Sequence, residues 1–481
     1  MTLDYDDIQG TILRGYRVDL ARHFVLSVAD RGRARNFMAS LITPSSGMPQ
    51  ITTAARWNVK PPSFLNIGIT ANGLEALGHA LEHPLDDAPS FSHGATDTTI
   101  AEKVGDVGDS APSKWINGLS DGMKVHLILS LWVTADHDEL ERVSALLRDA
   151  FARFSLTELG VQDATALPDN KIHFGYTDNI SQPRVDGAPP PKLPLPDMQS
   201  TAPTGEFLLG YPNQFNAPKA GFRVTPDQLS KNSSFGVFRL LEQDVAGFES
   251  WLQREAPTVD LDVEALAAKV CGRWRNGMPL VLCPDTPDSP VVAPDQINNY
   301  TYLSSDNDRD DTFGYKCPIG AHMRRSNPRN EAVRGAPDEG SKHRITRRAM
   351  PYGPAYDPNE PADTTRGLVG WFINASIEQG FEFVMRAWVN NPSGENFVAS
   401  RPGPHRADPR SNISGRDVLL GANDPTISSF IIPEPPADAD DPRSRAKHKK
   451  LTGFRSFVTT RGGAYCLLPS IHALRYISGA G

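Results

Sequence analysis

One histidine stands in a segment whose composition suits a metal or cofactor site. Residues 317–329 read CPIGAHMRRSNPR, so His322 follows residues that carry little bulk or break helices and precedes three arginines. Histidine is the usual neutral nitrogen ligand for a transition metal or for haem iron. Guanidinium groups nearby would suit a cofactor with two carboxylates. The alternative is a basic surface turn with an ordinary polar histidine, and the segment taken alone favours that alternative.

Two other segments carry charged residues beside turn formers. Residues 174–183, FGYTDNISQP, contain Asp178, and residues 344–353, RITRRAMPYG, contain Arg347. Alone, Asp178 reads as a turn carboxylate that hydrogen-bonds its own backbone. Alone, Arg347 reads as part of a basic edge strand that ends in a Pro-Tyr-Gly turn. Their meaning therefore depends on whether the fold brings them to His322.

Composition describes an ordinary globular protein without the marks of several metal or nucleic-acid classes. The chain has 481 residues and a net charge of −8, so no basic stripe for nucleic acid is expected. The cysteines are widely spaced, which argues against zinc ribbons, thioredoxin-type motifs and iron–sulfur clusters. The absence of Cys-x-x-Cys-His argues against covalent haem attachment. We expect four reduced, mostly buried thiols: Cys271, Cys283, Cys317 and Cys466.

The N-terminus and the apolar pattern bear on location. Residues 1–10, MTLDYDDIQG, are acidic and lack the apolar core of a signal peptide. No run of about 18 apolar residues is present, so no membrane association is expected. These features predict a cytoplasmic protein.

The order of secondary-structure elements predicts the fold class. Strands and helices alternate without the glycine fingerprint of a parallel nucleotide-binding sheet, which favours an α+β fold with antiparallel sheets. Asp136 is the expected N-cap of the helix with the clearest apolar periodicity, residues 136–153. In the first part, strands are expected at residues 23–29, 63–69 and 123–134, and helices at 33–42, 73–79 and 136–153.

After a proline-rich connector, residues 189–196, the second part of the chain again alternates strands and helices. The similarity is one of pattern, without a sequence repeat. Residues 434–450, acidic and then basic, are expected to form a solvated loop. Strands are expected at residues 235–240 and 367–375, and helices at 244–253, 262–271 and 377–388.

Taken together, the segments resemble the dye-decolourising peroxidase family in its longer bacterial and fungal branch. The resemblance runs in order along nearly the whole chain, and the combination is specific although each piece alone is weak. Besides the three segments above, it rests on DIQGTILRGY at residues 7–16, FGVFRLLEQDV at 235–245 and ASIEQGFEF at 375–383.

The resemblance implies a cofactor and a role for each candidate residue. His322 resembles the proximal axial ligand of a non-covalent haem b. Asp178 matches the distal aspartate of the family's Gly-x-x-Asp-Gly motif, and Arg347 matches the distal arginine before the Met-Pro-Tyr-Gly turn. The implied fold has two ferredoxin-like domains of the dimeric α+β barrel type, residues 1–205 with the distal aspartate loop at their end and residues 206–481 with the haem.

Three positions depart from the family pattern. Asn179 replaces the final glycine of the distal motif, and asparagine tolerates a left-handed backbone better than most residues. Ala349 stands where some relatives carry asparagine. Gly370 falls where many relatives carry a bulky aromatic, so the distal pocket is either wider or filled by Trp371 or Phe372.

The implied roles suit peroxide chemistry. One histidine ligand leaves the opposite haem face open. An aspartate is ionised at neutral pH, so Asp178 could take a proton from hydrogen peroxide. Arg347 would supply a permanent charge that stabilises the leaving hydroxide and keeps Asp178 ionised. The sequence ranks neither residue above the other, and it does not identify the acceptor for the second N–H of His322.

Several alternatives stay open. His343 could compete with His322 as ligand, although it lacks the surrounding motif. The reductants would be small aromatic molecules such as dyes and phenols, reached at a haem edge or through a surface ring. The rival function is a protein that carries haem or releases its iron from the same pocket. A homo-oligomer is compatible with all of these. Candidate relay rings, each more simply explained as core or turn residues, are Tyr352, Tyr356, Trp371 and Trp388.

Overall fold

The computed structural model gives the arrangement of most of the chain. It describes residues 3–189, 199–215, 221–288, 293, 296–306, 309–331, 342–361, 363–392, 414–436 and 447–480. Most of the proline-rich connector at residues 189–196 therefore lies outside the described residues. Among the helices that are described, none combines the length and apolar character that crossing a membrane requires.

The first half of the chain forms four antiparallel strands in the order β4-β1-β3-β2. β3 is buried at every position and β1 and β2 are buried at most positions, whereas β4 lies at the edge of the sheet and is only partly buried. Asp136 caps the following helix as expected, accepting a hydrogen bond from the Glu139 N–H at 3.0 Å. The elements are β1 (Leu20–Val28), α2 (Arg31–Ser40), β2 (Ser63–Ile69), β3 (Leu127–Val133), α7 (His137–Arg153) and β4 (Leu156–Thr165).

The second half repeats the same order of elements. Its strands run β10-β5-β7-β6, again antiparallel, so each half has a β-α-β-β-α-β order with its fourth strand beside its first. The elements are β5 (Ser234–Gln243), α8 (Val245–Glu255), α9 (Val263–Cys271), β6 (Thr346–Tyr352), β7 (Gly367–Asn374), α11 (Phe381–Phe383) with the π-helical turn η10 (Val384–Val389), and β10 (Val458–Leu468).

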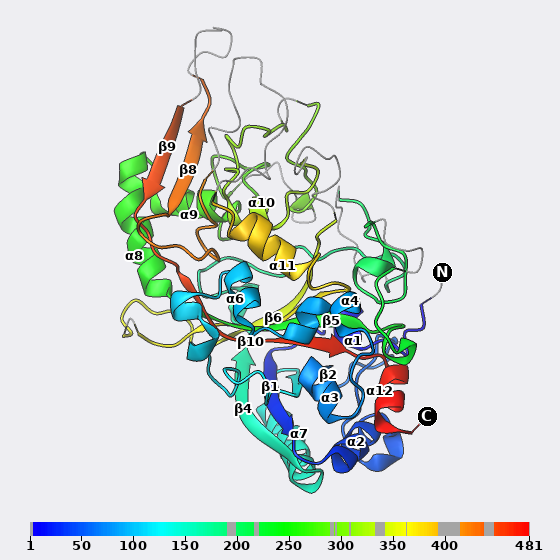
Figure 1. The fold of residues 1–481 in the computed structure, drawn as a ribbon. Coiled ribbons are helices and arrows are strands. Elements are labelled where there is room, and N and C mark those ends of the chain that lie inside the picture. The colour runs from blue at the N-terminus through cyan, green and yellow to red at the C-terminus, as the bar shows by residue number, and fades with distance from the viewer. Residues whose placement is uncertain are drawn as a thin grey trace.

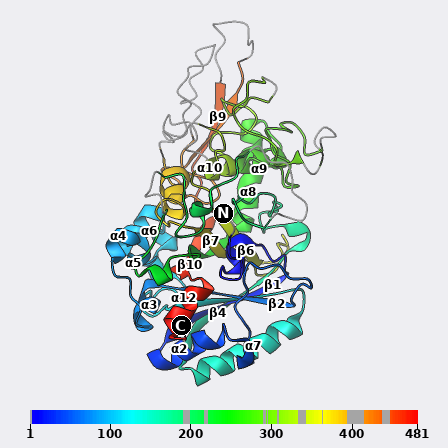
Figure 2. The ribbon, with the colours of Figure 1, turned by 90° about the vertical axis from the view of Figure 1, so that its right-hand side faces the viewer.

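A single contact joins the two halves into one sheet. Leu467 of β10 pairs with Ile69 of β2, so the eight described strands of this sheet are continuous. In Figure 1 the helices α2 and α7 lie below the sheet, whereas α8, α9 and α11 lie above it, and Figure 2 shows the same separation from the side. The predicted α+β class with antiparallel sheets and ferredoxin-like halves is confirmed.

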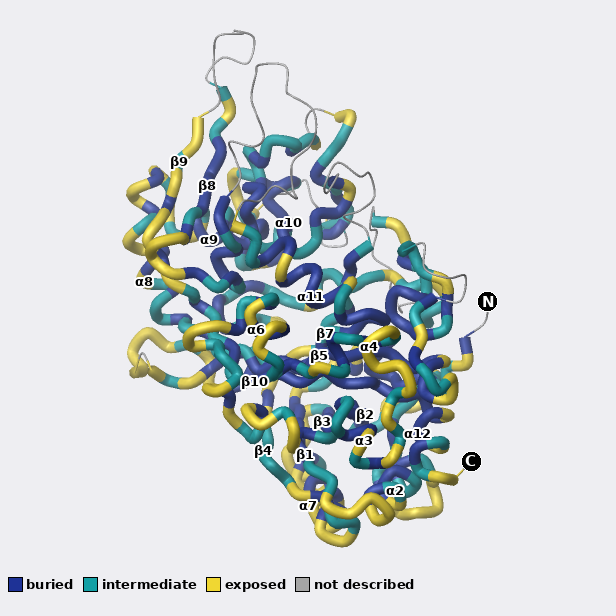
Figure 3. The backbone as a smooth tube through the Cα atoms, in the orientation of Figure 1, coloured by how far each residue is buried: buried dark blue, intermediate teal, exposed yellow. Residues whose placement is uncertain are grey.

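Close packing around one tryptophan leaves no space for side chains at two glycines of neighbouring strands. The buried residues, dark blue in Figure 3, run through both halves. Trp371 of β7 is only 2% exposed and lies against Gly68 and Gly236. A Cβ atom at either glycine would lie within 2.8 Å of the indole, so these positions admit no side chain. All four cysteines are buried and free, as the sequence predicted.

Shorter elements complete the described fold. The helices are α1 (Gly10–Leu13), α3 (Ala71–Ala76), α4 (Pro84–Asp87), α5 (Pro89–His93), α6 (Thr98–Val104), α10 (His322–Ser326) and α12 (Ile471–Ser478). A two-stranded sheet is made by β8 (Ser429–Glu434) and β9 (Lys447–Thr452).

Two expectations about local structure were wrong, and some strands were not predicted. The helix expected at residues 377–388 begins at Phe381 and ends as a π-helical turn. The expected loop at residues 434–450 ends in β9, where Lys449 pairs with Glu434 of β8 at 3.0 Å, because charged side chains on an exposed edge do not prevent strand pairing. β4 and β10 were missed, since β4 lacks a clear apolar alternation and β10 is rich in glycine and threonine.

Candidate active site

His322 opens the short helix α10, and its imidazole is oriented by a buried carboxylate. Its Nδ1 lies 3.0 Å from Oδ2 of Asp417, which is completely buried. An ionised carboxylate can only accept hydrogen bonds, so Nδ1 carries the proton and donates it. The lone pair is then on Nε2, which has no hydrogen-bond partner among the described residues. The side chain keeps 22% of its surface accessible, so Nε2 can serve as a ligand.

Asp417 is held ionised by its own surroundings. Its Oδ1 accepts hydrogen bonds from the backbone N–H groups of Leu419 and Leu420 at 2.9 and 2.7 Å. Burial acts to raise the pKa of Asp417, but His322, the Leu420 N–H and the Arg325 guanidinium outweigh it and lower the pKa below its ordinary value. Asp417 lies 95 residues from His322 in sequence, and no local motif marks it. A lone aspartate before the apolar Val-Leu-Leu run was the one available signal.

Arg324 and Arg325, which follow His322, are buried and bind other parts of the protein rather than facing solvent. Arg324 is fully buried and pairs with Asp311 at 3.1 Å and Glu331 at 2.5 Å. Arg325 donates to the backbone carbonyls of Trp388, Ser414 and Gly415. The donors of Arg324 and Arg325 are therefore engaged within the protein rather than directed at cofactor carboxylates. A buried guanidinium must satisfy its donors locally, and both find partners within the protein.

Asp178 and Arg347 meet although they are far apart in sequence. Asp178 Oδ1 lies 3.6 Å from Arg347 Nη2, and each side chain is 37% exposed. The Asp178 loop is tied to β6 because the Arg347 N–H donates to Gln182 Oε1 at 3.1 Å and Arg347 Nη2 donates to the Ser181 carbonyl at 3.4 Å. Sequence reasoning missed Gln182, whose amide fixes the backbone beside the arginine.

The Asp178 loop contains a left-handed residue at the position where asparagine replaces the glycine of the motif. Asn179 has φ +60°, the left-handed region that glycine would otherwise fill. The Asp178 N–H donates to the Asn170 carbonyl at 2.8 Å. Thr177 donates from both its N–H and its hydroxyl to the Arg275 carbonyl, each at 3.1 Å. The loop is therefore anchored on both sides of Asp178 before any ligand binds.

The end of helix α9 connects the two parts of the site. A Cβ at Gly272, directly after α9, would contact Cys317 and Ala321 just before His322, and a Cβ at Gly277 would lie 2.6 Å from Ile180 in the Asp178 loop. Burial, and then the carboxylates of Asp417 and Asp178 among its neighbours, raise the pKa of Cys271 to about 12. Residues 272–277 thus pack against both the segment that precedes His322 and the loop that carries Asp178.

The strand register decides which aromatic residue shares a face with Arg347. Phe372 pairs directly with Arg347 across β6 and β7, so the two side chains lie on one face. Trp371 points to the other face, where its indole N–H donates to Ser130 Oγ at 3.0 Å. Gly370 has φ +155°, and a Cβ there would lie 2.1 Å from the Arg348 carbonyl, so no aromatic residue fits at that position.

The other candidate rings lie mostly in the interior. His343 is 2% exposed, stacks on Phe383 with ring centroids 3.5 Å apart, and contacts the Gln379 carbonyl through Nδ1. It therefore behaves as part of an aromatic cluster. Tyr352, Trp371 and Trp388 are buried, whereas Tyr356 is partly exposed and lies beneath the Arg366 guanidinium.

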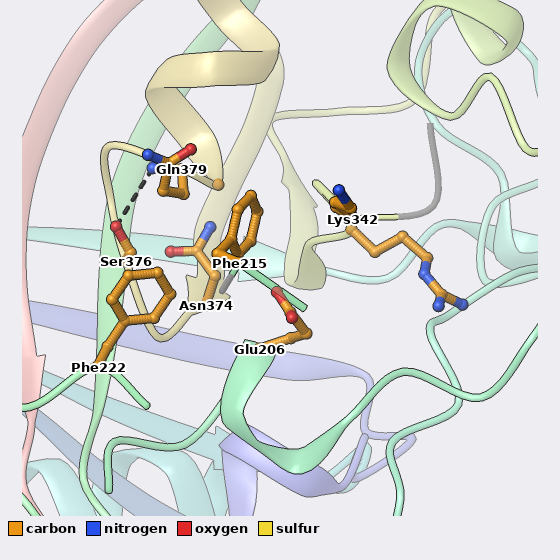
Figure 4. Close-up of a pocket in the computed structure, with 9 residues that line it drawn as sticks. Glu206, Phe215, Phe222, Lys342, Asn374, Ser376 and Gln379 are labelled. Atoms are coloured by element: carbon orange, nitrogen blue, oxygen red, sulfur yellow. Dashed lines mark hydrogen bonds between the residues drawn. The ribbon is translucent and has the colours of Figure 1, made fainter. Parts of the chain in front are cut away.

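A small pocket lies beside the start of β6 (Figure 4). Glu206 faces it across from Asn374 and Ser376, with Lys342 and Arg344 also lining it. Glu206 is only 6% exposed, and its Oε1 accepts the Gln214 N–H at 2.6 Å. Burial raises the pKa of Glu206 to about 7, partly offset by the Gln214 N–H and the nearby Arg344 and Lys342.

This carboxyl predicts a pH-dependent stability. The unfolded chain releases the Glu206 proton above about pH 4.3, whereas the folded chain keeps it to about pH 7. Stability therefore falls as pH rises between these values, by on the order of 3 kcal/mol. In thermal unfolding from pH 5 to 8, Glu206→Gln should lose this downward trend, while Glu75→Gln at an exposed position should keep it. Equal slopes in all three proteins would contradict the prediction.

The chain is similar to peroxidases over its whole length, although no family model matches it. A dye-decolorizing peroxidase of Mycetinis scorodonius is 30% identical over 500 residues, covering 99% of this chain and 88% of the relative. The crystal structure of a fungal DyP-type peroxidase from Auricularia auricula-judae superposes with a TM-score of 0.78 at 25% identity, covering 100% of this chain and 99% of the other. A dye-decolorizing peroxidase with an engineered heme pocket also superposes with a TM-score of 0.78, at 25% identity over 99% of this chain and 100% of that one.

Proposed function

Because the chain belongs to the dye-decolorizing peroxidase family, and is therefore a haem enzyme that oxidises dyes, we propose that His322, Asp178 and Arg347 carry its activity around a non-covalent haem b. The observation that carries the proposal is the pair of preformed contacts: His322 held by Asp417 at 3.0 Å, and Asp178 beside Arg347 at 3.6 Å. We also propose that residues 1–205 and 206–481 are the two domains, with the haem in the second.

The residues present fit a haem with one axial ligand. His322 has an accessible ring whose Nε2 meets no hydrogen-bond partner in the described part of the chain, and its Nδ1–H is fixed by Asp417. A charged acceptor makes the imidazole a stronger electron donor to iron. A bound haem supplies an iron that takes up hydrogen peroxide and stores its oxidising power. The role of this chain on that side is to fix the ligand's tautomer and angle.

Asp178 is proposed to move the proton of hydrogen peroxide. Its side chain is 37% exposed, and among the described residues its one side-chain contact is the long one to Arg347, so its carboxylate is accessible to a small ligand. Taking the proton from one peroxide oxygen and returning it to the other lets the distal oxygen leave as water. Positioned proton transfer of this kind is typically worth about 10²–10⁴-fold.

Arg347 is proposed to stabilise the charge that develops as the O–O bond breaks. Gln182 and Ser181 fix its backbone and one guanidinium nitrogen, so its donors are oriented before the substrate arrives. The guanidinium stays charged throughout, and it favours the ionised form of Asp178. Phe372 on the same face would limit water around the pair.

The substrates are proposed to be hydrogen peroxide and small aromatic reductants. The rival function, carrying haem or releasing its iron, is not favoured by the peroxidase relatives. Mixing the haem-loaded protein with peroxide and a dye distinguishes the two. Bleaching over many turnovers with the haem spectrum retained supports the proposal. Stoichiometric release of iron without dye bleaching would overturn it.

Asp417→Asn is expected to weaken haem binding about 10–100-fold, because an amide no longer offers a charged acceptor to the imidazole N–H. Titrating haem into the protein and following the Soret band gives the affinity. Asp424→Asn changes an exposed carboxylate in the same region and should bind haem as the wild type does. Equal affinities for all three proteins would show that Asp417 has no part in holding His322.

A further inference from the structure

The loop that carries Asp178 is anchored on one carbonyl of the turn after helix α9. The Arg275 carbonyl accepts hydrogen bonds from the N–H and the hydroxyl of Thr177, each at 3.1 Å, and from Lys171 Nζ at 2.6 Å. Lys171 and Thr177 also form an isolated antiparallel bridge, so these two residues close the loop. Because Thr177 directly precedes Asp178, the position of residue 275 sets where the backbone of Asp178 begins.

The Arg275 side chain fixes this turn to two helices. Its Nη2 lies 2.5 Å from Glu249 Oε1 on α8, and its Nη1 lies 2.8 Å from Glu264 Oε1 on α9. The side chains of Arg275 and Glu249 are 21% and 19% exposed, whereas that of Glu264 is 53% exposed. Water and salt screen a charge pair less when both partners are mostly buried, so Glu249 is the stronger partner. Arg275 therefore links the turn to α8 chiefly through one carboxylate.

The same side chain packs against the loop itself. Gly175 has φ +85°, and a Cβ atom there would lie 3.1 Å from Cδ and 3.3 Å from Nε of Arg275. The Arg275 Cζ atom lies 5.8 Å from the ring centroid of Tyr176, whose hydroxyl donates to the Ala267 carbonyl of α9 at 2.8 Å. Arg275 thus lies between the loop and the two helices, and a shorter side chain would leave a gap beside residues 175–176.

Glu249 and Arg275 depend on each other. Burial raises the pKa of Glu249, and the Arg275 guanidinium opposes that rise. Without the guanidinium, this mostly buried carboxyl would either take up a proton or remain as an unpaired charge. Without the carboxylate, the guanidinium would keep only its exposed partner, Glu264. Replacing either residue is therefore expected to release the same link between the turn and α8.

We propose that Arg275 is a positioning residue for Asp178, an inference that rests on the proposed peroxidase function. Its guanidinium, held by Glu249, fixes the turn after α9, and its carbonyl holds Thr177 so that the Asp178 carboxylate is within reach of peroxide. Proton transfer requires hydrogen-bond distance between the carboxylate and the peroxide oxygen, so a displacement of about 1 Å slows this step strongly. Arg275 does not transfer the proton itself and acts through the backbone of the loop.

Hydrogen–deuterium exchange of the purified, haem-loaded protein tests the anchor without any turnover. Arg275→Met keeps an unbranched stem and removes the charge. It should speed exchange of the amide hydrogens of residues 175–178 about tenfold, whereas those of helix α7 should exchange as in the wild type. Arg254→Met removes an exposed guanidinium on α8, paired with Glu255 at 2.9 Å, and should leave the loop unchanged. Unchanged exchange of the loop in Arg275→Met would overturn the proposal.

The reaction with peroxide tests the consequence for Asp178. Haem-loaded Arg275→Met should react with hydrogen peroxide about tenfold more slowly, while the Soret band of the resting protein and the KM for the dye stay unchanged. Arg275→Lys retains a positive charge for Glu249 and should recover most of the rate and most of the slow exchange of the loop. A faster-exchanging loop with a wild-type peroxide rate, or no recovery in Arg275→Lys, would contradict the positioning role.

Glu249→Gln and the double variant test whether the effect passes through the ion pair. Glu249→Gln should slow the peroxide reaction as Arg275→Met does. The double variant should be no slower than either single variant, because both changes remove one link. Single losses that multiply in the double variant would show that the two residues act separately and would overturn the proposal. A wild type whose loop exchanges slowly but which does not react with peroxide would instead count against the proposed function.

Discussion

His322→Ala is expected to remove the Soret band from the purified protein and to reduce peroxide-driven dye bleaching to background. The imidazole is the axial donor in the proposed site, and alanine has no group that could bind iron. A non-covalent haem would retain only apolar and polar contacts with the pocket, which do not set its coordination. The measurement is the absorption spectrum after haem loading, followed by dye turnover.

The control for this variant is His343→Ala. His343 is stacked on Phe383 and is 2% exposed, so its removal should lower the melting temperature and leave the haem spectrum in place. The pair of variants separates a ligand from a core residue. A full Soret band in His322→Ala, lost only when His343 is also replaced, would assign the iron to His343 and refute the proposed site.

Arg347→Leu is expected to slow the reaction with hydrogen peroxide by about 10²–10³-fold, and Asp178→Ala by about 10²–10⁴-fold. Leucine removes the fixed charge beside the breaking bond, and alanine removes the proton acceptor. Stopped-flow spectra of the haem-loaded proteins mixed with peroxide measure this step before any dye is oxidised. The haem spectrum at rest should be retained in both variants, because neither residue is the proposed axial ligand.

The double variant tests whether the two residues act together. Because their charges lie 3.6 Å apart, the rate loss in the double variant should be smaller than the product of the two single losses. Arg348→Leu is not a suitable control, since Arg348 is half-buried and donates to the Thr11 carbonyl at 2.9 Å. Arg386→Leu, an exposed position on η10, serves instead and should react normally. Wild-type peroxide rates in both single variants would refute the proposed roles.

Local signals determined much of the fold. Residues 63–69 form β2 as predicted, and the helix capped by Asp136 ends at Arg153, because apolar periodicity and a capping side chain act over a few residues. Asn179 likewise adopts a left-handed conformation, which asparagine tolerates better than most residues. These features depend on neighbours in sequence, so a single chain is enough to predict them.

The pairing of strands that are distant in sequence could not be predicted from such local signals. β10 enters the sheet beside β5 and meets β2 at one residue pair, which makes the sheet continuous. Which of Trp371 and Phe372 faces Arg347 depends on register, because a shift of one residue reverses every side chain of a strand. Neither property is encoded within one segment.

By itself, the sequence determined which residue types were available for peroxide chemistry and where they stood: His322, Asp178 and Arg347, each within a distinctive motif. Only the tertiary structure decided how they are supported. It brought Asp178 to Arg347 and placed Asp417, 95 residues away, against the ring of His322. The reason is physical: a motif fixes local backbone geometry, whereas a buried charge must find its partner wherever the folded chain provides one.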